Sequence, residues 1–125
     1  MTENQISEKI IGRAIEVHKV LGPGLFEGAY LECLYYGLQK TALNIEKQKP
    51  LPLIYEEITL VAAYRSDLIV ENKVNVDLKS IYEFHDIHIA PVITYLKLSG
   101  CIVGLLMNFN VLRLTDGIKR LVNKL

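Results

Sequence analysis

Two runs rich in β-branched residues lie on either side of a short polar segment in the middle of the chain. Apolar and polar residues alternate along residues 66–70 and again along 74–79, with Glu71-Asn72-Lys73 between them. This pattern predicts a β-hairpin. A turn centred on Asn72 places the apolar residues of both strands on one face, namely Leu68, Val70, Val74, Val76 and Leu78. A register shifted by one residue would mix the two faces, so burial of the apolar face selects this register.

The other face of the predicted hairpin carries the candidate chemistry. Its residues are Arg65, Asp67, Ile69, Asn75, Asp77 and Lys79. Asp67 is expected directly opposite Asp77, about 5 Å away at Cβ, and two acids there repel unless a cation, a proton or basic neighbours offset the charge. The same pair suits a hard divalent cation, which prefers oxygen ligands. A polar strand face in contact with solvent would produce the pattern without any function.

Apolar periodicity predicts three helices, over residues 6–21, 26–41 and 87–99. Thr2 and Gln5 fit a capping box before the first helix, and Pro91 is expected in the first turn of the third. Strands are expected over residues 45–54, where prolines indicate a sheet edge, and over 58–64. Residues 101–109 are apolar enough for a strand covered on both faces. Residues 111–125 form either a hairpin or a strand and a helix.

The third helix joins two strands that are expected to be parallel, through a right-handed crossover. The expected fold is therefore one α/β domain over residues 1–125, with a mixed sheet flanked by helices. No stretch of the sequence fits a signal peptide or a membrane span. Cys33 and Cys101 are expected as free thiols in a reducing compartment. A cytoplasmic location without membrane contact follows.

Charge changes this picture little. Fourteen basic residues balance fourteen acidic ones, so no global basic excess indicates nucleic-acid binding. One segment near the C-terminus is locally basic, because Asp116 is its only acid. Its basic residues are Arg113, Lys119, Arg120 and Lys124.

Several motifs resemble those of one family. Gly24-x-x-Glu27-x-x-Tyr30 reproduces the signature of the GxxExxY family, and Y-R-S-D-L-I-V at residues 64–70 is similar to its Y-R-A-D-L-L-V stretch. T-Y-L-K-L at residues 94–98, N-F-N and D-G-I-K-R match it as well. This family is placed in the PD-(D/E)XK nuclease-like superfamily. The resemblance implies a restriction-endonuclease-like core with the order α-β-β-β-α-β.

The resemblance also implies roles for individual residues. Asp67 corresponds to the first acid, Asp77-Leu78-Lys79 to the (D/E)xK unit and Glu27 to the helical acid. Asp67, Asp77 and Glu27 would hold Mg²⁺ or Mn²⁺, assisted by the Leu78 carbonyl, while Lys79 would orient or activate the attacking water. Residues expected to contact the substrate are Arg65, Tyr30, His88 and Tyr95. Neither His85 nor His88 is expected to bind the cation, because a hard oxygen site does not favour imidazole.

Three functions follow from these patterns. The first is a metal-dependent nuclease acting on nucleic acid, with DNA as the expected substrate. The second is a catalytically silent module of the same fold that binds nucleic acid or protein, and the third is a structural protein that assembles with a partner or with its own copies. Retention of Lys79 favours the enzyme. Where the family commonly reads H-E-A-Q, this chain has Ile89 and Pro91 in place of the glutamate and glutamine, which favours the silent module.

Overall fold

The computed structural model describes residues 1–123, apart from the side chains of residues 62 and 63. Lys124 of the predicted basic segment therefore lies outside the described residues. The elements in chain order are α1 (Glu3–Leu21), α2 (Glu27–Gln39), β1 (Ile45–Lys47), β2 (Pro50–Tyr55), β3 (Ile58–Arg65), β4 (Leu68–Val70), β5 (Val74–Lys79), α3 (Asp86–Ser99), β6 (Val103–Asn108), a 3-10 helix (Leu114–Gly117) and β7 (Ile118–Val122).

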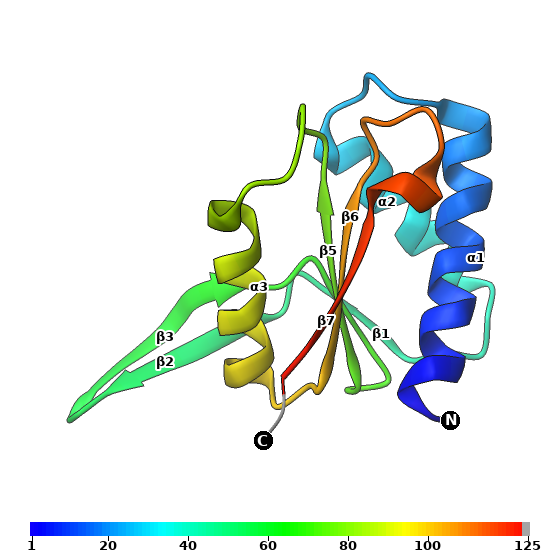
Figure 1. Cartoon of the computed structure of the whole chain (residues 1–125). Helices are drawn as coiled ribbons and strands as arrows, with labels where there is room; N and C mark the ends of the chain where they lie inside the picture. The colour runs from blue at the N-terminus through cyan, green and yellow to red at the C-terminus, as the bar shows by residue number, and fades with distance from the viewer. Residues whose placement is uncertain (124–125) are drawn as a thin grey trace.

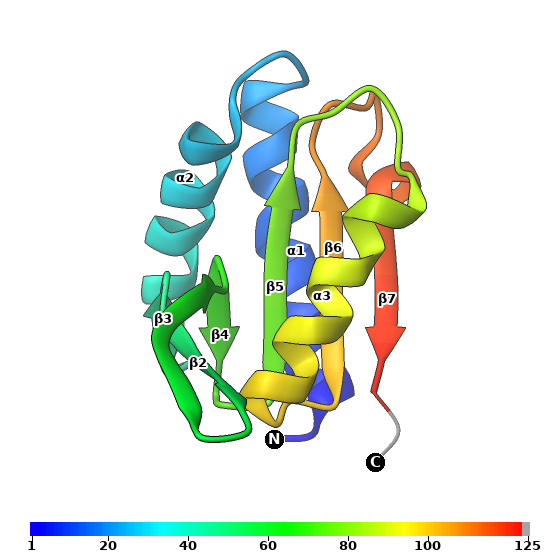
Figure 2. The same ribbon diagram turned by 90° about the vertical axis from the view of Figure 1, so that its left-hand side faces the viewer.

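A mixed five-stranded sheet forms the middle layer of the molecule, with the strand order β1-β4-β5-β6-β7. β5 and β6 run parallel and are joined by α3, whereas the other neighbouring strands are antiparallel. α1 and α2 lie on one side of the sheet and α3 lies on the other (Figure 1, Figure 2). The expected α/β architecture, with a mixed sheet between helices, is confirmed.

The central hairpin has the register that its apolar pattern predicts. Leu68 pairs with Val76 and Val70 pairs with Val74, and the turn holds Asn72 in a left-handed conformation with φ 53°. The apolar face of the hairpin belongs to the main core, together with residues of α1 and α2. Burial of that face fixes the register, because a slip of one residue would bring the polar side chains into this core.

The opposite face of the hairpin is also covered, so the interpretation as a solvent-exposed polar face is wrong. Ile69 is buried with Leu96 of α3 in a second apolar cluster, and Asn75 and Asp77 are 0% and 4% exposed. α3 covers this side because the parallel crossover from β5 to β6 must pass over one face of the sheet. The polar residues of β5 are therefore held in a largely dry environment.

Two expectations about local structure are corrected. Residues 45–54 form two strands in different sheets, because the chain turns at Gln48, which has a positive φ of 52°. β2 and β3 then make a two-stranded arm that projects from the body (Figure 1). Pro91 is the sixth residue of α3 rather than part of its first turn, because the helix already begins at Asp86. The C-terminal segment follows the strand-and-helix alternative, with a 3-10 helix before β7.

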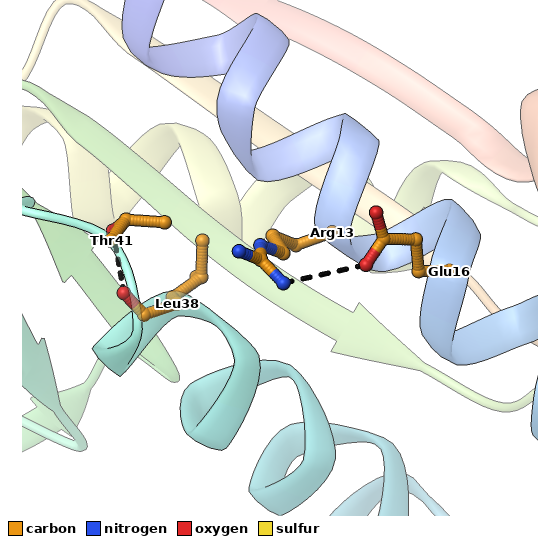
Figure 3. Close-up of polar contacts among 4 residues, drawn as sticks. All are labelled: Arg13, Glu16, Leu38 and Thr41. Atoms are coloured by element: carbon orange, nitrogen blue, oxygen red, sulfur yellow. Dashed lines mark hydrogen bonds and ion pairs between the residues drawn. The ribbon is translucent and has the colours of Figure 1, made fainter.

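Local polar contacts define the ends of the first two helices. Thr2 and Gln5 form the expected capping box at the start of α1. Farther along α1, Arg13 pairs with Glu16 at 3.4 Å near the C-terminal end of α2, where the Thr41 hydroxyl donates to the Leu38 carbonyl (Figure 3).

Within residues 1–123, no helix has the length and apolar character needed to cross a membrane.

Candidate active site

The candidate site begins with two acids at one end of the central hairpin. Asp77 lies on β5, and Asp67 directly precedes β4. The Asp67 carboxylate accepts a hydrogen bond from the backbone N–H of Leu78 at 2.8 Å, and the Asp67 carbonyl accepts one from the N–H of Gln48 at 2.9 Å. These bonds hold the Asp67 side chain against β5, across the hairpin from Asp77.

The environment of Asp77 strongly disfavours its charged form. Burial, the side-chain hydrogen bond with Asp67 and the charge of Asp67 together raise the pKa of Asp77 to about 8. The charge of Lys79 acts in the opposite direction. The Asp77 carboxyl therefore keeps its proton to a much higher pH than an ordinary aspartate does.

Lys79 lies beside this acid pair. Its ammonium nitrogen is 3.9 Å from a carboxylate oxygen of Asp77, and its side chain is 26% exposed. Two residues apart on one strand, the two side chains point to the same face. The Lys79 ammonium can therefore interact with Asp77 and with a molecule that approaches from solvent.

Glu27 lies at the start of α2, at the same end of the sheet as the C-terminal end of β5 (Figure 2). Its charge contributes to the raised pKa of Asp77. However, residues 1–123 contain no group of three or more His, Cys, Asp or Glu side chains that could hold a metal ion. Glu27 is exposed, and its role as a third acid beside the two aspartates stays a prediction.

Tyr95 on α3 is an aromatic residue whose pKa is affected by the charges of the acid pair. Burial and the negative charges of Asp77 and Asp67 raise the pKa of the Tyr95 phenol. Its ring meets the ring of Tyr64 edge-on, with the centroids 5.9 Å apart. Tyr95 thus links α3 to the base of the β2–β3 arm, and it is half-buried. Its contact with substrate stays a prediction.

Neither Arg65 nor His88 forms a hydrogen bond or ion pair with Asp67 or Asp77 within the described residues. Arg65 is exposed at the end of β3 and is not among the charges that shift the pKa of Asp77. His88 accepts a hydrogen bond from the backbone N–H of His85 at 2.9 Å and caps the start of α3. Both remain accessible at the edges of the site region, Arg65 exposed and His88 half-buried.

Tyr30 was expected to contact the substrate, but the structure buries its side chain. The side chain is completely buried, and its ring stacks on Phe109 with centroids 4.6 Å apart. Its hydroxyl donates to the Gly22 carbonyl at 2.6 Å and accepts from the N–H of Leu25 at 3.0 Å. A residue without exposed surface does not touch a substrate, so Tyr30 supports the loop between α1 and α2 instead.

The predicted basic segment is partly engaged elsewhere. Arg113 pairs with Asp116 at 3.4 Å, and Arg120 donates to the side chain of Asn4 at 2.9 Å. Arg120 lies on β7, and Arg113 directly precedes the 3-10 helix before that strand. Both side chains are therefore engaged with other residues of the chain.

Two polar residues next to the acids were not identified as functional from the sequence. The Ser66 hydroxyl bonds to the Leu68 carbonyl at 3.0 Å and to the side-chain oxygen of Asn75. Asn75 has no exposed surface, and its side-chain nitrogen has no hydrogen-bond partner. An asparagine between two valines, two residues before Asp77, was the available signal. Together Ser66 and Asn75 hold the backbone on either side of Asp67 in place.

The chemistry of the donor set fits a hard divalent cation. The two carboxyl groups lie close enough to share a proton, and a cation bound between them would take the place of that proton. Carboxylate and carbonyl oxygens are the ligands that Mg²⁺ and Mn²⁺ prefer. A carboxyl pair held this way is costly to bury without a cation, which is the pattern expected of a functional site.

A family model of the PD-(D/E)XK nuclease superfamily matches residues 4–121. Neither the search of curated proteins nor the search of solved structures gave a match. The matched span runs from α1 into β7 and includes both acids and the lysine described above. The chain is therefore a member of the PD-(D/E)XK nuclease superfamily.

Proposed function

We propose that the protein is a metal-dependent phosphodiesterase that hydrolyses nucleic acid, with DNA as the expected substrate, and that it belongs to the GxxExxY branch of the superfamily. We place it in the cytoplasm, where Cys33 and Cys101 would stay reduced. The observation that carries the proposal is the contact between the buried Asp77 and Asp67, with Lys79 3.9 Å from Asp77.

The acid pair is the natural place for the cation. Asp67 and Asp77 would hold Mg²⁺ or Mn²⁺, and the backbone carbonyl of Leu78 would supply a further oxygen. When bound, such a cation supplies Lewis-acid chemistry: it lowers the pKa of water and offsets negative charge that builds on the phosphate. Glu27 would act from outside this pair, through its charge or through water.

Lys79 and Tyr95 would act on the substrate. The partly exposed Lys79 ammonium can donate to a phosphate oxygen while Asp77 holds its position. The Tyr95 phenol, whose pKa is raised beside the acids, stays protonated at neutral pH and can donate a hydrogen bond. Arg65 and His88, at the edges of the site, are proposed to contact the phosphate backbone. Ser66 and Asn75 would keep Asp67 in place.

Cleavage assays on the parent protein, Asp77→Asn and Lys79→Ala test this function. Each protein is incubated with single- and double-stranded DNA and RNA in Mg²⁺, Mn²⁺ or EDTA. We expect cleavage by the parent with Mn²⁺ or Mg²⁺, and a loss of about 100-fold or more in both variants. Asp116→Asn and Lys9→Ala, which change matched residues away from the site, should cleave like the parent.

The silent-module alternative gives a different result. It predicts no cleavage by any of the proteins, including the parent in millimolar Mn²⁺, and that result would overturn the proposed enzyme. Cleavage that survives in both Asp77→Asn and Lys79→Ala would indicate a contaminating nuclease or a different site, and would overturn it as well.

A further inference from the structure

We infer that the hydroxyl groups of Tyr30 and Ser80 clamp the loop between α1 and α2, and that they thereby hold Glu27 next to the acid pair. Both are positioning residues, because they act on Glu27 through the backbone of Leu25. This inference rests on the proposed function, in which Glu27 contributes to the metal site from outside the aspartate pair.

Leu25 is held at both of its backbone polar groups. Its N–H donates to the Tyr30 hydroxyl at 3.0 Å, and its carbonyl accepts from the Ser80 hydroxyl at 2.5 Å. The Tyr30 hydroxyl also donates to the Gly22 carbonyl at 2.6 Å. One phenol therefore ties the beginning of the loop to its end, two residues before Glu27.

The loop has little else to hold it. Gly22 and Gly24 have left-handed φ values of 67° and 103°, and the N-cap residue Phe26 makes no side-chain capping bond. Leu25 and Phe26 are 38% and 75% exposed, so apolar burial contributes little to their placement. Hydrogen bonds to fixed partners are then the main restraint on where α2 begins.

The two hydroxyls come from rigid parts of the molecule. Tyr30 is buried against Phe109. Ser80 directly follows Lys79, and the next residue, Ile81, is bonded at both backbone groups to the side chain of Asn108, at 3.1 and 3.0 Å. The clamp therefore runs from the end of β5, which carries Asp77, through Leu25 to the start of α2.

This arrangement explains the spacing Gly24-x-x-Glu27-x-x-Tyr30. Tyr30 lies one helical turn after Glu27, so its ring can enter the core while its hydroxyl turns back to the loop before the helix. Gly24 supplies the left-handed conformation that the loop needs. A phenylalanine in place of Tyr30 would keep the packing and lose the hydrogen bonds.

The experiment compares Tyr30→Phe, Ser80→Ala, Glu27→Gln and the double variant Tyr30→Phe/Glu27→Gln with the parent. Tyr36→Phe is the matched control, since Tyr36 lies on the same helix but is 62% exposed. The dissociation constant for Mn²⁺ is measured by electron paramagnetic resonance of the free ion. In EDTA, the hydrogen-exchange rate of the Leu25 amide is measured by NMR, which reports the clamp without any metal.

We expect Glu27→Gln to weaken Mn²⁺ binding about tenfold, as for a group that supports metal ligands from outside. Tyr30→Phe and Ser80→Ala should weaken it about three- to tenfold, while Tyr36→Phe should have no effect. The double variant should bind like Glu27→Gln alone, because two changes on one route are not additive. The Leu25 amide should exchange about tenfold faster in Tyr30→Phe.

The possible failures are distinguishable. Three results would each overturn this inference and leave the aspartate site standing. Tyr30→Phe and Ser80→Ala could bind Mn²⁺ as tightly as the parent, or Glu27→Gln could do so. The losses of affinity from Tyr30→Phe and Glu27→Gln could also be additive in the double variant. A parent that takes up no Mn²⁺ would overturn the proposed function together with the inference. Ser80→Ala changes a surface hydroxyl only, so it decides the question even if Tyr30→Phe loses stability.

Discussion

The two faces of β5 are both buried, yet they carry opposite chemistry. Val74, Val76 and Leu78 point into the core beneath α1 and α2. On the other face, under α3, Asn75 has an unpaired side-chain nitrogen and Asp77 is 4% exposed with a pKa raised to about 8. One strand thus combines a face that stabilises the fold with a face that costs stability.

This contrast indicates what each face is for. Burying the apolar side chains contributes about 1.5–3 kcal/mol for each large residue and selects the register. Burying a carboxyl pair has no such benefit, because desolvation and mutual repulsion both act against it. The polar face is therefore best explained by the chemistry of a bound cation, and single substitutions on the two faces should have opposite effects.

The largest contrast is expected between two neighbouring residues. Leu78→Ala should lower the free energy of unfolding by about 2–5 kcal/mol, because it leaves a cavity in the main core. Asp77→Asn should leave that free energy unchanged or higher at pH 8.5, since one of two facing charges is removed. Urea unfolding in EDTA measures both. An Asp77→Asn variant as unstable as Leu78→Ala would show that Asp77 has a structural role.

The pH dependence of stability sharpens the comparison. Asp77 has a pKa of about 8 in the folded protein against a reference value of 3.8, so the folded state holds an extra proton between these values. Its contribution is fully present below about pH 4 and is lost as the pH rises towards 8, with a slope of at most about 1.4 kcal/mol per pH unit.

Urea unfolding of the metal-free protein from pH 4 to 9 measures this slope. Asp77→Asn should lose this component, whereas Asp116→Asn should keep it. A parent whose stability rises with pH across the same window would contradict the protonated acid pair.

A smaller effect is expected where α3 meets the polar face. Tyr95→Phe should lower the cleavage rate about tenfold, the value of one hydrogen bond to a charged group, and should leave Mn²⁺ affinity within about threefold of the parent. Steady-state cleavage and Mn²⁺ titration of the same preparation separate the two quantities. A parallel loss of affinity would instead place the phenol among the groups that hold the cation.

The smallest effect is expected at the start of α3. A His85→Ala, His88→Ala double variant should bind Mn²⁺ like the parent and lose about 1 kcal/mol of stability, because the capping contact of His88 with the His85 backbone is removed. Titrations with Mn²⁺ and Zn²⁺, together with urea unfolding, measure these values. Tight Zn²⁺ binding that disappears in the variant would reveal an imidazole site.

The sequence was sufficient to predict those parts of the fold in which apolar and polar residues follow a regular pattern. The hairpin register follows from five apolar positions, and the parallel crossover follows from a helix placed between two apolar strands. The cover provided by α3 was not foreseen, because Asn75 and Asp77 have the polarity of an exposed face. The break at Gln48 was also missed, since a positive φ at a glutamine leaves no sequence signal.

The candidate site was foreseen in part for a similar reason. Alternation along the strands places Asp67, Asp77 and Lys79 on one face of the hairpin, and the structure brings their side chains together. The burial of Tyr30 and the position of Glu27 relative to the aspartates depend on how α2 packs on the sheet. Periodicity gives the buried stripe of a helix but does not give the position of its first turn relative to a strand.

The most direct test of the cation-binding acid pair is thermal unfolding of the parent and Asp77→Asn, each in EDTA and in millimolar Mn²⁺. A ligand that binds only the folded state raises its melting temperature. We expect Mn²⁺ to raise the melting temperature of the parent, and Asp77→Asn to melt at or above the metal-free parent with no response to Mn²⁺. A parent that does not respond, or equal shifts in both proteins, would contradict the account.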